Sequence, residues 1–560
     1  MSRSQIFLMM QSLLVLALWP GFALAASPPL LQDGPVAWYA ADDTPIPLPA
    51  FEEPGLVPYA YQSFVSRPFS RFFHPGRFVR WVGQGDRGRP AGSVNALDEV
   101  VNSTWFTNRH GLRPMTDEEL VTGPGLPEGP DRSQPWTIIG AKTSGVTPGF
   151  RIRDGKGDVW LLKFDPAEQP GMGIRSGVVT NLIFHAIGYH VPVDRLVTFD
   201  RRDLVVAEGV TMKLQRNLRA TVTEANLDSL LQATHSVFNG RYQALASRYL
   251  DGTPLGPFDV QDTRLDDPND LIPHQDRREL RGLRVFAAWV NHFDTKMHNS
   301  LDMYVGPEGQ GHVKHYLIDF ASTLGACGDE PVKRFGYEFG VDVFPFLGRM
   351  LALGLHEDAW VSVNRPPGLP EVGLFVAEPF APEKWKPDMP HTAMAHLTRY
   401  DGYWAAKIVS AFTDDQLRLL VEQGGYTDSR SVDYLTATLA ARRDKIARHW
   451  FDLVPPLDFF LPGERGVRFT DLARERGYAG PEPARYRYRI GAVDAERHCR
   501  EWFPWTETDT TWVPFSDVPA LSESHPFRAV ECQVFREGQW SSSTTVYLGS
   551  RAGRVIALDR

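Results

Sequence analysis

Apolar residues recur three and four positions apart in several long stretches of this 560-residue chain. Residues 174–187 and 277–291 show this spacing most clearly, and each stretch therefore predicts an amphipathic helix. The same spacing returns at residues 414–423 and 431–451, so we expect the chain from about 343 to 450 to be mainly helical.

Alternating apolar and polar residues predict strands around these helices. Residues 150–153 alternate in this way before the first helix. Residues 136–139 and 159–164 beside them, and residues 301–305 and 313–318 after the second helix, also predict strands, bounded by glycine-bearing loops and turns. We therefore expect an α+β fold in which strands and helices share the middle of the chain.

The two ends of the chain differ from this middle part. Residues 26–134 are rich in Pro, Gly and aromatic residues and show few periodic segments, so we expect an irregular extension packed on the first strand-rich part. After Pro455-Pro456, alternating segments such as 529–535 and 544–548 predict a small C-terminal β domain.

The N-terminus carries the pattern of a secretory signal peptide. A nearly unbroken apolar run at residues 6–18 is followed by the small-x-small sequence Ala23-Leu24-Ala25, which predicts cleavage after residue 25. The mature chain would then be exported, to the periplasm or the cell exterior, although an uncleaved membrane anchor is the alternative. No later stretch has eighteen consecutive apolar residues, so we expect no transmembrane segment after cleavage.

Charge and cysteine content narrow the possible partners. The formal net charge is −9, and no basic cluster is evident, which argues against a nucleic-acid partner. Of the three cysteines, Cys499 and Cys532 flank one strand-rich segment and are the more favourable pair in an oxidising compartment, which would leave Cys327 free. The sequence alone does not fix that pairing.

One motif carries most of the chemical information. The run from His292 to Asn299 reads His-Phe-Asp-Thr-Lys-Met-His-Asn and has the spacing H-x-D-x-K-x-x-N. Asp319-Phe-Ala follows twenty residues later and is similar to the metal-binding D-F-G motif, with Ala321 in place of Gly. The first motif resembles the catalytic loop of protein kinases, in which an Asp accepts the proton of a substrate hydroxyl and an Asn five residues later holds a metal ion.

A glycine-bearing loop and a lysine strand precede this motif. The loop at residues 140–149 contains Lys142, Gly145 and Gly149. The strand at 150–153 follows it, and the returning strand at 159–164 carries Lys163 near its end. Glycines allow the backbone to approach phosphates closely, and a lysine adds a positive charge near their oxygens. Taken alone, this pattern is also that of a plain hairpin turn and a solvent-facing lysine.

Residues of about 135–345 resemble the protein-kinase-like fold, in particular atypical members such as HipA-like kinases, CotH-like kinases and phosphatidylinositol kinases. The resemblance implies a two-lobed core and a transferase that uses ATP with Mg²⁺ or Mn²⁺. By this resemblance Asp294 would be the catalytic base, and Lys296 would steady the phosphoryl group during transfer. Asn299 and Asp319 would bind the metal ion. The nucleotide would be bound by Lys163, Lys142, Gly145 and Gly149. The expected division of the chain is a signal peptide at 1–25, an extension at 26–134 packed on the small lobe, a small lobe at 135–250, a large lobe at 251–455 and a β-rich domain at 456–560.

Two departures weaken the expectation of activity. A kinase helix normally carries a glutamate that pairs with the strand lysine, but residues 171–191 contain no acidic residue. Glu168, Glu208 or Glu224 could reach Lys163 from elsewhere in the fold. The second departure is the D-F-A sequence itself.

Two other functions therefore stay open. The chain could be a catalytically inactive kinase-like module that binds a nucleotide or another partner. Alternatively, a cluster of His292, Asp294, His298, His312 and His315 could hold a transition metal in a hydrolase, although Lys296 would repel the cation. Nothing in the sequence identifies a protein, lipid or sugar acceptor, or the oligomeric state.

Overall fold

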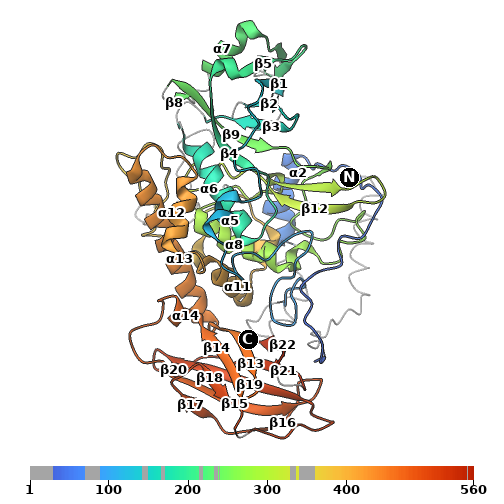
Figure 1. Cartoon of the computed structure of the whole chain (residues 1–560), viewed down its shortest axis with the longest axis vertical. Coiled ribbons are helices and arrows are strands. Elements are labelled where there is room, and N and C mark those ends of the chain that lie inside the picture. The colour runs from blue at the N-terminus through green and yellow to red at the C-terminus, as the bar shows by residue number, and fades with distance from the viewer. Residues whose placement is uncertain are drawn as a thin grey trace, which may run out of the picture.

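The structure is a computed structural model. It describes residues 30–69, 89–141, 149–165, 169, 171–213, 219–232, 237–238, 240–327, 336–339, 360–516, 518–550 and 553–560. The predicted signal peptide, residues 1–25, lies outside the described residues. The fold is α+β with several separate sheets, and Figure 1 shows one sheet at one end of an elongated molecule, helices in the middle and C-terminal strands at the other end.

The first sheet is mixed, and it has the strand order β4-β9-β3-β2-β1-β5, with β8 paired to β9. Among its described strands, only β1 and β5 pair in parallel. Its inner face is covered by a core that includes Trp136, Trp160 and Phe199. The strands are β1 (Trp136–Ala141), β2 (Gly149–Arg153), β3 (Val159–Lys163), β4 (Asp194–Phe199), β5 (Leu204–Val206), β8 (Val237–Phe238) and β9 (Arg241–Arg248).

Helix α6 (Met172–Ile187) lies between this sheet and the helical part of the molecule (Figure 1). Almost every residue of α6 is buried, because the helix packs on the sheet from one side and on other helices from the other. The helix ends at Gly188, whose φ of 140° lies in the region that favours glycine.

The middle of the molecule is a bundle that contains α8 (Arg278–Val290), α11 (Arg399–Val409), α12 (Asp414–Glu422) and α13 (Ser429–Leu453). These helices and α6 share one continuous hydrophobic core. A three-stranded sheet of β10 (Thr253–Gly256), β11 (Ser300–Val305) and β12 (His312–Leu317) packs beside them. The expectation of a mainly helical chain up to 450 is wrong for residues 360–391, where the described chain has only turns, bends and a 3₁₀ turn, a stretch that contains seven prolines.

The C-terminal strands form two further sheets. The order of one is β13-β14-β18, and that of the other is β16-β15-β19-β21-β22, with β17 and β20 paired to β15 and β19. Their bounds are β13 (Leu457–Gly463), β14 (Gly466–Asp471), β15 (Tyr486–Val493), β16 (Cys499–Trp502), β17 (Thr506–Thr508), β18 (Trp512–Pro514), β19 (Phe527–Arg536), β20 (Gln539–Trp540), β21 (Thr544–Leu548) and β22 (Val555–Asp559).

The proposed disulfide does not form. None of the three cysteines, all of which the structure describes, is in a disulfide. Cys499 lies opposite Val493 of β15, whereas Cys532 lies opposite Tyr488 on the other edge of the same strand. Five residues of strand separate these two positions, or about 17 Å, which is far beyond the Cα separation of a disulfide.

The N-terminal segment, residues 26–134, was expected to pack on the first strand-rich part, and its described residues also contact the middle of the molecule. Its last residues do pack on the first sheet, where the Asp131 amide donates to Asp154. Earlier residues lie on the middle part instead. Glu52 donates its amide to the Leu255 carbonyl at 3.0 Å, and the Trp105 ring stacks on His315 at a centroid distance of 3.5 Å.

The remaining described elements are short. They are α2 (Leu56–Tyr61), the π-helix η1 (Gln62–Ser66), α5 (Asp117–Thr122), β6 (Thr211–Lys213), β7 (Arg219–Thr221), α7 (Glu224–Gln232), α10 (Thr392–Ala395), α14 (Leu472–Glu475) and the 3₁₀ turns η3 (Arg201–Asp203), η5 (His274–Asp276), η6 (Met297–Asn299) and η7 (Pro382–Lys384). Among the described residues, no helix is both long enough and apolar enough to cross a membrane.

Candidate functional site

Lys163 and Asp319, which are 156 residues apart in the sequence, form an ion pair. The Lys163 Nζ lies 3.1 Å from Asp319 Oδ1, and its side chain is only 14% exposed. Burial alone would lower the pKa of this ammonium, but the carboxylates of Asp319 and Asp194 outweigh burial and raise it. Lys163 is therefore held as a cation at the end of β3.

Backbone contacts place Asp319 beside the H-x-D-x-K-x-x-N segment. The amide of Ile318 donates to the Asn299 carbonyl at 3.0 Å. The Asn299 side chain in turn donates through Nδ2 to the Asp294 carbonyl at 2.6 Å. Asp319 itself has a φ of 64°, in the left-handed region, at the turn that directs the chain toward Phe320. Asn299 thus connects the two motifs.

Asp294 and Lys296 pair with each other. The Lys296 Nζ lies 2.6 and 2.8 Å from the two carboxylate oxygens of Asp294, and both side chains are about one-quarter exposed. The segment that bears them begins where α8 ends at Asn291, whose φ of 53° is also left-handed. The buried Arg442 of α13 donates to the carbonyls of Ala288 and Trp289 and so fixes this helix end.

His292 lies between these groups. Its ring contacts Phe184 and Phe320, at centroid distances of 6.0 and 5.5 Å. Burial lowers its pKa and Lys296 adds to this effect, whereas the carboxylates of Asp294 and Asp319 act in the opposite direction. The neutral, packed ring therefore holds Phe320 in place next to the segment that carries Asp294.

The packing of α6 explains why this helix carries no acidic residue. Its small residues lie against the chain that follows Asp319: a Cβ on Gly177 would stand 3.7 Å from the Ala321 backbone, and the Thr180 and Thr323 hydroxyls are 2.8 Å apart. The helix therefore approaches too closely for a long side chain to project between it and this segment. Glu224 pairs with Arg201, Glu208 is exposed in a turn, and Glu168 lies outside the described residues.

Asp194, which sequence reasoning missed, is the second acidic group that acts on Lys163. Lys163 lies opposite Leu245 of β9, and Asp194 lies opposite Ser247, so that both side chains are on one face of the sheet. Asp194 is 1% exposed. Burial raises its pKa to about 6, although Lys163 acts in the other direction. In the sequence, the one feature that could have identified Asp194 is an acidic residue at the start of a buried strand.

Asp165 was missed as well. It lies two residues after Lys163 and accepts hydrogen bonds at 3.0 Å from the amides of Gly173 and Ile174, at the N-terminus of α6. It thus supplies the cap that Gly171, at the N-cap position, does not have. Burial raises its pKa to about 7. Asp165 also lines a cavity of about 30 Å³ with Lys163 and Asp319, which is room for about one water molecule.

Of the predicted loop residues, only Gly149 can be placed. It is the first residue of β2 and lies directly opposite Lys163. Lys142 and Gly145 lie outside the described residues.

The histidine cluster of the hydrolase hypothesis is dispersed. His298 contacts the Pro54 carbonyl, and His315 pairs with the buried Asp302. In the part of the chain that the structure describes, no three His, Cys, Asp or Glu side chains are placed to hold a metal ion.

Comparisons with known proteins add little to this geometry. No protein-family model matches the chain, and no curated protein matches it either. A solved structure of a Helicobacter pylori proinflammatory kinase, CtkA, aligns with a TM-score of 0.28 and 11% sequence identity, over 55% of this chain and 94% of that chain.

Proposed function

We propose that residues 135–455 form a two-lobed, protein-kinase-like core, and that the exported chain transfers a phosphoryl or related nucleotidyl group from ATP. The observation that carries the proposal is the Lys163–Asp319 ion pair. It joins a β-strand lysine to the D-F segment, and Asn299 joins that segment to Asp294. This chain of contacts supports a common site for these four residues.

The donor set suits a hard divalent cation. Asn299 and Asp319 offer an amide and a carboxylate oxygen, which are ligands that Mg²⁺ and Mn²⁺ prefer. When bound, such an ion neutralises charge that builds up on the phosphoryl oxygens. Within the chain, Lys163 binds nucleotide phosphates, Asp294 accepts the proton of the acceptor hydroxyl, and Lys296 orients that carboxylate and steadies the phosphoryl group.

Asp194 has a positioning role in this proposal. With no glutamate on α6, Asp194 keeps Lys163 charged and directed along the sheet face while Asp319 is engaged elsewhere. The acceptor could be a protein, a lipid or a sugar, and the chemistry of the site does not select among them.

Titration calorimetry with ATP and Mg²⁺ or Mn²⁺ on the chain without residues 1–25 tests the proposal. We expect metal-dependent binding that weakens at least about tenfold in Lys163→Met and in Asp319→Asn, and by a smaller factor in Asp194→Asn. Lys156→Met is the matched control, because that lysine is 75% exposed in the turn before β3. Absence of metal-dependent binding, or equal affinity in Asp319→Asn, would contradict the proposal.

Transfer is tested separately from binding. Asp294→Asn should lower the rate of ATP turnover by at least about 100-fold while ATP affinity stays near that of the unchanged chain. The inactive binding module is the second candidate, and it is favoured by the Asp294 carboxylate, whose two oxygens are both engaged by Lys296. Nucleotide binding without turnover would select that candidate.

A further inference from the structure

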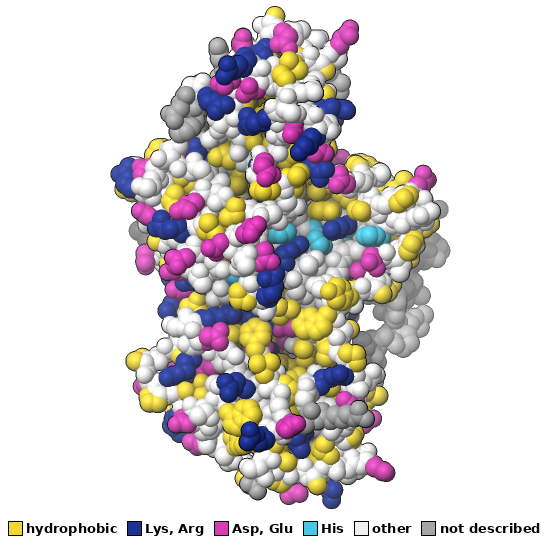
Figure 2. All heavy atoms as spheres, viewed as in Figure 1, with side chains coloured by type: hydrophobic (Ala, Val, Ile, Leu, Met, Phe, Trp, Pro, Cys, Tyr) yellow, Lys and Arg dark blue, Asp and Glu magenta, His cyan; other side chains and the backbone are white. Residues whose placement is uncertain are grey.

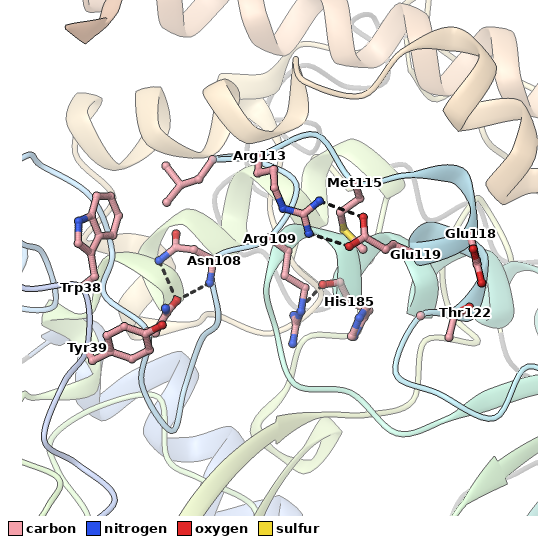
Figure 3. A pocket seen from close by; sticks show the side chains of 13 residues that line it. Trp38, Tyr39, Asn108, Arg109, Arg113, Met115, Glu118, Glu119, Thr122 and His185 are labelled. Carbon is pink, nitrogen blue, oxygen red and sulfur yellow. Dashed lines mark hydrogen bonds and ion pairs between the residues drawn. The ribbon is translucent and has the colours of Figure 1, made fainter. Parts of the chain in front are cut away.

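A second, larger cavity lies at the opposite end of α6. Its volume is about 850 Å³, it opens to solvent, and residues 38–39, 102–123 and the end of α6 line it (Figure 3). The sixteen residues of α6 separate it from Lys163 by about 24 Å of helix. None of the residues proposed for phosphoryl transfer lines this cavity.

Arg109 gives the cavity a positive charge. Figure 3 shows its side chain in the middle of the pocket wall, between Asn108 and His185. Its Nη1 donates to the carbonyls of His185 and Tyr189, at 2.7 and 3.2 Å. Burial lowers its pKa to about 10, so that it stays charged at neutral pH. Among the described residues, no carboxylate lies within ion-pair distance of Arg109.

Other ionisable groups near Arg109 do not neutralise it. Burial lowers the pKa of His185 to about 3, with Arg109 and Arg195 adding to the effect, so the imidazole is neutral. Glu119 is engaged by Arg113 at 2.7 Å and also caps α5. Glu118 is exposed at the far edge of the pocket in Figure 3. One buried, unneutralised guanidinium therefore favours a ligand with a single negative charge.

Aromatic rings form the opposite wall of the cavity. The Tyr39 ring is 77% exposed, and backbone hydrogen bonds of 2.8 Å tie both neighbouring positions to Asn102. The side-chain oxygen of Asn102 accepts from the backbone and side chain of Asn108. An exposed ring on a fixed backbone presents a flat apolar surface at low entropic cost, beside amide groups that suit hydroxyls.

We propose that this cavity binds an acidic sugar, a pyranose that carries a carboxylate. The carboxylate would pair with the free edge of the Arg109 guanidinium, and the apolar face of the sugar ring would stack on Tyr39 and Trp38. A polyphosphate is disfavoured, because Arg109 is the one cation in the cavity lining without a carboxylate partner and Glu118 adds a negative charge at the edge. The site is independent of the proposed transferase activity.

Calorimetry with D-glucuronate, D-glucose and AMP tests this assignment on the chain without residues 1–25. We expect glucuronate to bind with a Kd between about 10 μM and 1 mM, and glucose, which lacks the carboxylate, to bind at least about tenfold more weakly. Arg109→Gln and Tyr39→Ala should each weaken glucuronate binding by about tenfold.

Two controls keep the test decisive. Arg109 also caps α6, so Arg109→Gln can lower stability, whereas Tyr39 has an exposed ring whose loss should not affect folding. Tyr61→Ala is the matched control, because that ring is 63% exposed on α2 and does not line the cavity. No saturable binding of glucuronate up to about 10 mM, equal binding of glucose, unchanged affinity in Tyr39→Ala, or tighter binding of AMP would each overturn the proposal.

Discussion

At the scale of single residues, burial shifts the pKa of two carboxyl groups toward neutral pH. Asp194 shares a sheet face with Lys163 and Asp165 follows Lys163 by two residues, and burial raises their pKa values to about 6 and about 7. Asp165 is the simpler of the two to test, because its partners are backbone amides that an asparagine oxygen can also satisfy.

Asp165→Asn should change how stability depends on pH. A carboxyl group whose pKa is higher in the folded chain stabilises the fold below its unfolded value near 4, and this contribution is lost as pH rises through about 7. The unchanged chain should therefore lose on the order of 2–4 kcal/mol between pH 4 and pH 8 through this group, whereas the variant should not.

Urea unfolding at several pH values measures this difference. Asp251→Asn is the control, because that side chain is 81% exposed. Parallel stability profiles for the unchanged chain and Asp165→Asn would show that the Asp165 carboxyl titrates normally.

At the scale of secondary-structure elements, α6 depends on two glycines at its N-terminal half. A Cβ on Gly173 would stand 2.8 Å from Asp165 Oδ1, so Gly173→Ala should displace the helix cap and destabilise the fold by about 1–3 kcal/mol. Gly177→Ala should cost less, because its new Cβ meets the flexible end of Leu245 at 2.9 Å and the gain in helix propensity offsets part of the strain.

Denaturant midpoints of the two variants check this order. Both substitutions have the same chemistry on the same helix, so each serves as the control for the other. A larger loss in Gly177→Ala than in Gly173→Ala would mean that close packing on Ala321, and not the cap, limits this helix.

At the scale of the whole molecule, a buried charge network joins three distant parts of the chain. Lys407 of α11 contacts both Glu99 and Asp458, and Arg560 lies 2.7 Å from Asp458. Burial would lower the pKa of Arg560, but Asp458 and the neighbouring groups raise it instead. These buried ion pairs therefore connect the N-terminal segment, the helical part and the C-terminal strands. Removal of one charged partner leaves the opposite charge buried and uncompensated.

Arg560→Ala should lower the free energy of unfolding by about 3–5 kcal/mol, because it leaves Asp458 and Glu99 with one cation between them. Arg554→Ala, which removes an exposed arginine from the same region, should change it by less than about 0.5 kcal/mol. Thermal or chemical denaturation measures both. Equal effects of the two substitutions would show that the network contributes little net stability.

The charged side chains on the surface are mixed in sign. Basic and acidic side chains are interspersed over the face in Figure 2, without a continuous patch of one sign. This arrangement fits a chain of net charge −9.

Much of the local structure follows from the sequence itself. The strands at 136–164, the helix at 174–187 and the helix at 277–291 were predicted to within a few residues, and the structure confirms them as β1 to β3, α6 and α8. Such elements depend on side-chain periods of two and 3.6, which can be read over a few turns of chain. Irregular stretches such as 360–391 have no hydrophobic period, and the prediction of helical structure is wrong there.

Tertiary structure alone decided which groups meet. The sequence named Lys163 and Asp319, but only packing brings them to 3.1 Å, adds Asp194 from a neighbouring strand, and separates Cys499 from Cys532. Contacts over a hundred or more residues depend on strand order, register and the close approach of helices. A local pattern does not encode these, because the same pattern is compatible with many arrangements of the chain.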